Sequence, residues 1–347
     1  MTETLSQYSA ILLYCTMVVY AAAFVAFAID LAQRSAAAGR PVAQSGAGEQ
    51  LTAAQRRAAA QTTQTASGQA GGSGTVTTLD RPTVIDDDAE IARTRSGGVV
   101  IRVAMALTWL GFIAHLLATI LRGVAAERVP WANMWEFSMT GTVLMVGVFL
   151  GVQFKLDLRF LGAFLIGLVL MLLGIASLQY YVDVVPLPPA LQSYWLVIHV
   201  LVATLATGFF ALGFALSGVQ LMRTRYEESE DSPPTWLGFL KTLPAAVTLE
   251  NLAYRLNVIG FILWTFTLIA GSIWAEAAWG RYWGWDTKEV WTFIIWVIYA
   301  GYIHARATRG WRGSRSAWLA IVGFSAVMFN FGIVNVFFKG LHAYSGL

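Results

Sequence analysis

Long apolar runs separated by short polar segments dominate the pattern of this 347-residue chain. A helix needs roughly 20 mostly apolar residues to cross the hydrocarbon core of a bilayer, and the pattern predicts eight such spans. The seventh run is short, so its helix is expected to begin near Thr287 and to end around Arg306, whose side chain can reach the interface. The predicted spans are Ile11–Ile29, Val99–Leu121, Phe137–Phe154, Leu161–Leu178, Tyr194–Met222, Leu256–Ile273, Val290–Ile303 and Ala317–Phe338. The expected fold is therefore an all-α polytopic membrane protein.

Composition supports this fold class and excludes several others. Only 12% of the residues are charged, about half of the fraction that is usual in soluble domains. The net charge of +3 is too small to indicate nucleic-acid binding. Cys15 is the single cysteine, which excludes a disulfide framework, a CxxC redox pair and a CxxCH haem-attachment site within this sequence.

Polar segments and charge predict the domain organisation and the orientation. Residues 31–98 are rich in Ala, Gly, Gln, Ser and Thr, so they cannot bury enough surface to offset their ordering entropy. We interpret them as a disordered cytoplasmic insertion between a first span in residues 1–30 and a seven-helix membrane domain in residues 99–347. Residues 226–254 are expected to hold an interfacial helix that leads into span six. With the N-terminus outside, 18 of the 23 Lys and Arg residues lie inside, so the positive-inside rule places both termini outside.

All four histidines lie in or beside predicted spans. His115 and His304 lie inside spans two and seven, whereas His199 and His342 lie near the outer surface. An ionisable group in a span is a functional candidate by default, although a neutral imidazole bonded to another helix is the structural alternative. The grouping of the histidines into two pairs favours axial ligation of haem iron over a zinc site, because zinc takes three or four ligands. At a rise of 1.5 Å per residue, His115 and His304 would lie at depths in the bilayer that differ by about 10–15 Å. Of the two histidine pairs, this buried pair is therefore the less well supported as a set of haem ligands.

An external loop over residues 274–291 contains five tryptophans and a tyrosine. Their rings offer flat, rigid, apolar faces, and Gly280 and Gly284 would let the backbone approach a planar ligand closely. An aromatic belt at the membrane surface is the alternative, but a belt is spread over many helix ends. The loop therefore favours a platform for a planar ligand.

Charged residues of this loop have two kinds of expected role. Arg281 and Lys288 could meet carboxylates such as haem propionates. Asp286 stands where span seven begins and Glu289 follows three residues later, a spacing that predicts a capping box rather than acid–base catalysis. The outer start of span three has a similar set, for which capping or loop folding is expected: Asn133, Trp135 and Glu136.

Taken together, these segments resemble the CcsA (ResC) family of cytochrome c biogenesis, whose members are called CcsB in many actinobacteria. The segment WGRYWGWDTKEVW looks like the tryptophan-rich WWD signature of haem-handling proteins. The resemblance covers roughly residues 99–347 and the first span. Its other parts are VPWANMWEF (129–137), TLENLAYR (248–255), IGF (259–261), HARATRGWRG (304–313) and GLHAY (340–344).

The resemblance implies a role for each matched histidine. His115 and His304 would ligate haem within the membrane, and His199 and His342 would ligate haem at the outer face against the tryptophan-rich loop. Three tryptophans of that loop would cover the haem ring: Trp279, Trp283 and Trp285. Haem b would be both ligand and transported substrate, delivered across the bacterial plasma membrane and attached to the CxxCH thiols of apocytochrome c on the extracytoplasmic face. A CcsB (ResB)-type membrane protein would be the partner, and a thioredoxin-like reductant would act indirectly.

Two other functions remain open at this point. The chain could be a haem transporter or chaperone that passes haem to a separate ligase. It could also be a di-haem b-type electron-transfer protein, which would hold two haems stacked across the bilayer.

Overall fold

The computed structural model describes residues 2–38, 98–187, 191–228, 235–308, 310–338 and 340–342. Within these ranges the regular secondary structure is entirely helical, which confirms the predicted fold class. The long helices are α1 (Thr2–Ala38), α4 (Val99–Ala126), α5 (Met134–Val152), α6 (Gly162–Gln179), α7 (Tyr194–Glu228), α8 (Ala246–Trp279), α9 (Thr287–Thr308) and α10 (Ser314–Phe329). Shorter elements are η1 (Arg159–Leu161), η3 (Thr235–Thr242), η4 (Asn330–Val334) and α11 (Asn335–Phe337).

Among the described residues, seven helices are long and apolar enough to cross a membrane. They correspond to seven of the eight predicted spans, and the chain is a multi-pass membrane protein. The remaining predicted span, the short seventh run, corresponds to α9, which is 22 residues long but is not among these seven helices. The orientation of the termini stays a prediction.

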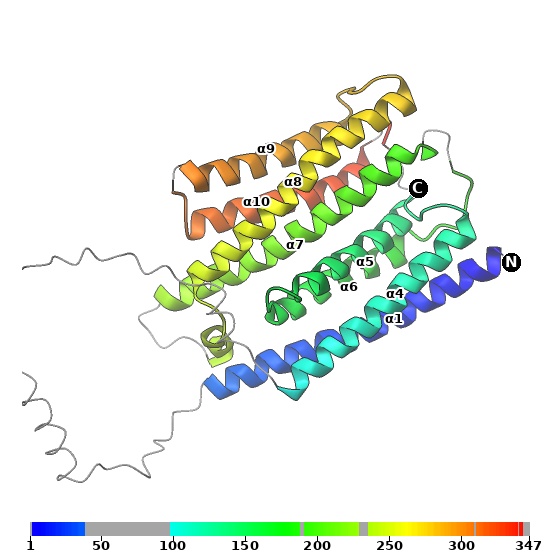
Figure 1. Cartoon of the computed structure of the whole chain (residues 1–347). Coiled ribbons are helices and arrows are strands. Elements are labelled where there is room, and N and C mark those ends of the chain that lie inside the picture. Colours follow the sequence, from blue (N-terminus) through cyan, green and yellow to red (C-terminus); the bar gives the residue numbers. More distant parts are fainter. Residues whose placement is uncertain are drawn as a thin grey trace, which may run out of the picture.

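The helices form two groups joined by a central pair (Figure 1). Helices α1 and α4 pack along each other, and α7 packs on α8 and α10. Helix α5 contacts both α4 and α7, so α5 and α6 lie between the two groups. Helix α9 packs on α8 and α10 at the edge far from α1 and α4.

Several helix boundaries differ from those expected, and three of them change the predicted organisation. Helix α1 continues to Ala38, so the first part of the predicted disordered insertion is helical, while residues 39–97 lie outside the described residues. Helix α8 begins at Ala246, because the segment expected as an interfacial helix continues directly into the span. The short element η3 comes directly before α8 in the chain. Helix α8 also extends to Trp279, where Gly280 ends it in the left-handed conformation, at φ 69°.

Candidate functional site

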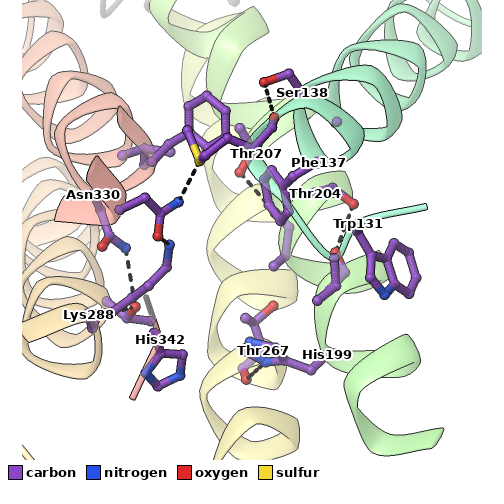
Figure 2. Close-up of a pocket in the computed structure, with 18 of the residues that line it drawn as sticks. Trp131, Phe137, Ser138, His199, Thr204, Thr207, Thr267, Lys288, Asn330 and His342 are labelled. Atoms are coloured by element: carbon purple, nitrogen blue, oxygen red, sulfur yellow. Dashed lines mark hydrogen bonds between the residues drawn. The ribbon is translucent and has the colours of Figure 1, made fainter. Parts of the chain in front are cut away.

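A cavity lies between α5, α7, α8 and the C-terminal elements, at the end of the bundle where α7 begins and α8 ends (Figure 2). It encloses about 1230 Å³ of space, counting the part that is open to solvent. Its deeper wall contains hydroxyl side chains of α5 and α7, but these bond to carbonyls of their own helices, as Thr204 does to Val200 O at 2.8 Å and Thr207 to Ala203 O at 2.9 Å. The cavity therefore presents a mostly apolar surface with a few free polar groups.

His199 lines the cavity from the first turns of α7. Its Nδ1 lies 3.0 Å from the carbonyl oxygen of Thr267 in α8. A carbonyl only accepts hydrogen bonds, so Nδ1 carries the hydrogen and Nε2 keeps its lone pair. A backbone carbonyl behind one ring nitrogen is the usual way in which proteins orient a metal-ligating histidine.

His342 lines the same cavity from the C-terminal segment. Its Nδ1 lies 3.6 Å from Asp286 Oδ1. Asp286 also accepts hydrogen bonds from the backbone N–H of Leu341, at 2.7 Å, and of Lys288, at 2.8 Å. The imidazole of His342 and these N–H groups hold the pKa of the Asp286 carboxyl well below its usual range. Asp286 thus fixes the C-terminal segment to the start of α9.

Trp274 connects the two histidines. Its buried indole stacks on the His199 ring, with centroids 5.8 Å apart, and contacts the His342 ring edge-on at 5.3 Å. Trp279 contacts His342 at 4.8 Å on another side. The structure therefore brings together the outer pair of histidines that the sequence singled out, around an aromatic residue of the expected loop.

The tryptophan-rich loop is shorter than predicted, because only residues 280–286 lie outside helices. Glu289 Oε2 accepts hydrogen bonds from the backbone N–H of Gly284, at 2.8 Å, and of Asp286, at 3.0 Å. With the Asp286–Lys288 contact, this is the predicted capping box at the start of α9.

The expected covering and cationic residues differ in their positions. Trp283 lines a recess of the site together with both histidines, whereas Trp285 is 73% exposed. Lys288 lines the cavity and donates a hydrogen bond to Asn335 Oδ1. Arg281 is exposed and is not among the residues that line the cavity.

The structure does not bring His115 and His304 together. His115 is completely buried on α4, where its Nδ1 lies 3.4 Å from the hydroxyl of Tyr20 in α1. His304 is exposed on α9. Helix α4 packs on α1 and α5, and α9 packs on α8 and α10, so the two histidines belong to opposite sides of the bundle.

Sequence reasoning missed two features of this end of the bundle. Phe137 of α5 stacks on Phe331 of η4, with centroids 5.4 Å apart, and both line the cavity. Glu136, expected only to take part in capping or loop folding, is completely buried between two arginines. The signal available was a carboxylate next to a predicted span with Arg122 and Arg128 nearby in sequence. Asn133 does cap α5, accepting a hydrogen bond from Glu136 N at 2.9 Å.

Comparison with known proteins gives relatives over most of the chain. The sequence is 34% identical over 277 residues to "Cytochrome c biogenesis protein CcsA" of Trieres chinensis, covering 70% of this chain and 88% of that protein. It is 33% identical over 274 residues to the protein of the same name from Gloeobacter violaceus, covering 65% and 81% respectively.

A solved structure has a similar fold. The structure titled "Cytochrome c Heme Lyase CcmF" matches with a TM-score of 0.51 and 19% sequence identity, over 74% of this chain. This chain spans 46% of the length of that protein, and at such low identity the likeness concerns the fold alone.

The sequence pattern of a protein family described as "Cytochrome C assembly protein" matches residues 131–342 of this chain. That range begins at Trp131 in the cavity wall and ends at His342, so it includes the whole tryptophan-rich loop and both cavity histidines. The chain belongs to the cytochrome c assembly protein family, with the CcsA proteins of cytochrome c biogenesis among its relatives.

Proposed function

We propose that this chain holds haem b in the outer cavity and presents it for covalent attachment to the CxxCH thiols of an apocytochrome c. The observation that carries the proposal is that His199 and His342 line one apolar cavity and contact the same indole ring, Trp274. Membership of the cytochrome c assembly family supports it.

The residues of the cavity fit a haem. Bis-imidazole ligation needs two neutral histidines, and His199 keeps a lone pair on Nε2 because Nδ1 faces the Thr267 carbonyl. The cavity walls include the aromatic rings of Trp131, Phe137 and Phe331, which suit the apolar faces of a planar ligand. Lys288 places an amino group in a mostly apolar site, where it would donate a hydrogen bond to a propionate.

Each residue then has a physical task. His199 and His342 hold the iron, Thr267 and Asp286 orient their rings, and Trp279 covers one side of His342. The apolar walls exclude water. Haem b supplies vinyl groups, to which the thiols of the apocytochrome add. The chain provides position and protection rather than a nucleophile, and a thioredoxin-like system would keep the substrate thiols reduced.

His304 suggests how haem reaches this chain. Its imidazole is exposed on α9, so a haem bound to it would take its second axial ligand from outside the described part of the chain. A ResB-type membrane partner in the bacterial plasma membrane is the proposed source of that contact. His115 has no such access, because it is completely buried against Tyr20.

The alternatives receive less support. A di-haem electron carrier needs a second pair of facing histidines, and within the described residues His115 and His304 lie on opposite sides of the bundle. A chaperone that passes haem to a separate ligase would use the same outer cavity, and only the product distinguishes it.

The test is covalent haem attachment in cells that lack the native protein but contain its partner and a reporter apocytochrome c. We expect His199→Ala and His342→Ala to lower the yield of covalent cytochrome to about a tenth of wild type or less. Wild-type yield in both variants would overturn the proposal. Normal haem loading without covalent product, even for wild type supplied with its partner, would favour the chaperone function instead.

A further inference from the structure

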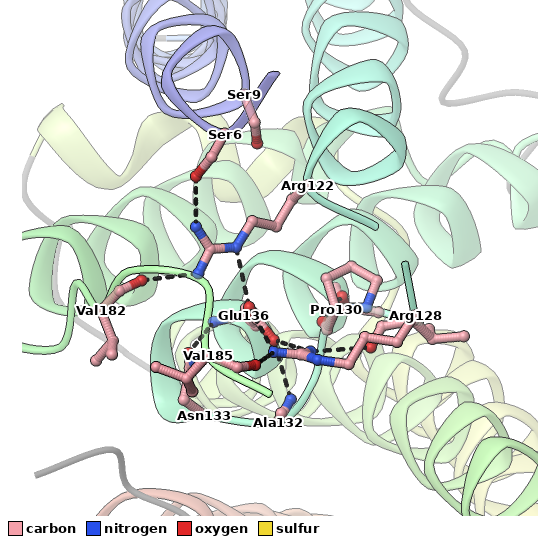
Figure 3. Close-up of polar contacts among 12 residues, drawn as sticks. Ser6, Ser9, Arg122, Arg128, Pro130, Ala132, Asn133, Glu136, Val182 and Val185 are labelled. Atoms are coloured by element: carbon pink, nitrogen blue, oxygen red, sulfur yellow. Dashed lines mark hydrogen bonds and ion pairs between the residues drawn. The ribbon is translucent and has the colours of Figure 1, made fainter. Parts of the chain in front are cut away.

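A buried ionic cluster lies next to the cavity (Figure 3). The completely buried carboxylate of Glu136 accepts hydrogen bonds from Arg122 Nε at 2.9 Å and from an Arg128 terminal nitrogen at 2.6 Å. Two guanidinium groups thus face one carboxylate among residues with almost no contact with solvent. We refer to Arg122, Arg128 and Glu136 as the clamp.

The clamp joins segments that are far apart in the sequence. Arg122 of α4 donates to the hydroxyl of Ser6 in α1, at 2.9 Å, and to the carbonyl of Val182, at 2.7 Å. Arg128 reaches the carbonyl of Val185 at 3.5 Å. As Figure 3 shows, both arginines extend toward the extended segment 180–187, which leads from α6 toward α7.

The same segments pack against the cluster around Trp274, beside the cavity. Glu136 also accepts a hydrogen bond from Ala132 N, at 3.1 Å, which fixes the loop residue directly after Trp131. Trp131 lines the cavity, and both Trp131 and Leu187 pack against the buried cluster around Trp274. Glu136 therefore holds two stretches of chain that pack around Trp274, one directly through Ala132 and the other through the two arginines.

Helix packing alone does not account for such a cluster. Burying two cations with one anion carries a desolvation cost that apolar residues of similar size would avoid. What the charges add is direction, because planar guanidinium groups fix carbonyl and carboxylate partners in defined positions. The carbonyls of Val182 and Val185, which have no role in helix packing, are the groups whose positions are fixed.

We propose that the clamp positions Trp131, in the cavity wall, and Leu187, which packs beside that wall, against the cluster around Trp274, and that it thereby sets how long haem stays in the outer site. This inference rests on the proposed function. Arg122, Arg128 and Glu136 are positioning residues, since none of them is among the residues that line the cavity.

The chain contains a matched control at the opposite end of the bundle. Glu250 is also buried, and it accepts hydrogen bonds from Arg306 Nε at 3.2 Å and from Gly313 N at 2.8 Å. It lies in the first turns of α8, about 36 Å along the helix from Trp274 at 1.5 Å per residue. Glu136→Gln and Glu250→Gln therefore each remove one buried carboxylate charge, near the cavity and far from it.

The first experiment measures haem release from purified protein to apomyoglobin. We expect Glu136→Gln to release haem about tenfold faster than wild type, equivalent to about 1.4 kcal/mol, while Glu250→Gln releases it at the wild-type rate. Equal rates for the two variants, whether fast or slow, would overturn the proposal.

The second experiment needs no haem, so it separates this inference from the proposed function. Leu187→Cys is introduced with Cys15→Ser, and the haem-free protein reacts with a polar maleimide. We expect Arg128→Gln to make labelling at residue 187 about tenfold faster. This variant leaves the Arg122–Glu136 ion pair in charge balance, so it keeps the fold even if Glu136→Gln unfolds the protein. Unchanged labelling with Arg128→Gln would overturn the proposal. Failure of wild type to bind haem at His199 and His342 would instead refute the proposed function.

Discussion

The orientation of a single imidazole ring is the residue-scale feature on which the outer site depends. The Thr267 carbonyl holds Nδ1 of the His199 ring, and Gly271, one turn further along α8, leaves room for the same edge of the ring. A Cβ atom at Gly271 would lie 2.7 Å from both Cε1 and Nδ1 of His199, too close for the ring to keep its position. The space that Gly271 provides is therefore part of the proposed ligand geometry.

Gly271→Ala should consequently impair haem binding without removing a ligand. We expect at least about tenfold faster haem release, although alanine itself favours the helix by up to ~1 kcal/mol over glycine. Gly218→Ala in α7, where a Cβ atom meets nothing within 4 Å, is the control. Haem release and thermal stability would be measured for both variants. Wild-type haem release from Gly271→Ala would show that the His199 ring does not need this position.

At the scale of elements, the start of α9 holds the C-terminal segment through Asp286. This carboxylate caps the helix, faces His342 and accepts the N–H of Leu341. Its pKa is lowered by the adjacent imidazole and N–H groups. A carboxyl whose pKa is lowered on folding contributes stability above its unfolded pKa of about 3.9 and loses that contribution as the pH falls.

Asp286→Asn tests this contribution, because asparagine keeps the capping function but not the charge. In the haem-free protein, we expect the variant to melt below wild type between about pH 5 and 8, with the difference narrowing below about pH 4. Melting curves across this range provide the measurement, and Glu276→Gln, at an exposed position near the end of α8, is the control for loss of a charge. A difference that stays constant down to pH 3 would contradict an ionic role for Asp286.

The elements also show which parts of the site could be predicted from sequence. The capping box at Asp286 and Glu289 was predictable, because it depends on residues three positions apart. The position of Trp285 was not: its backbone lies at φ 58° and its ring is mostly exposed, and loop conformation of this kind depends on contacts rather than on composition. Likewise, the ends of α8 were misplaced because the helix continues beyond the apolar run in both directions, through its polar first turns and on to Trp279, where Gly280 ends it.

At the scale of the whole molecule, the lengths of the apolar runs predicted the helices well, because each span must be apolar over about 20 residues on its own. The predicted spans also placed His199 and His342 at the same surface, and the structure brings both into one cavity. The apolar runs could not predict that α9 packs far from α4, which separates His304 from His115, because helix order within a bundle depends on packing between spans. The clamp was missed for the same reason: Arg122 and Val182 meet only through the tertiary structure.

The central claim is that His199 and His342 hold one haem in the outer cavity, and the optical spectrum of the purified protein tests it most directly. We expect a bis-imidazole haem spectrum for wild type that is lost in the variant His199→Ala/His342→Ala and kept in His115→Ala, whose imidazole lies outside the cavity. An outer-pair variant that retains the wild-type spectrum, or a wild-type protein that takes up no haem even with its partner and excess haem, would contradict this account.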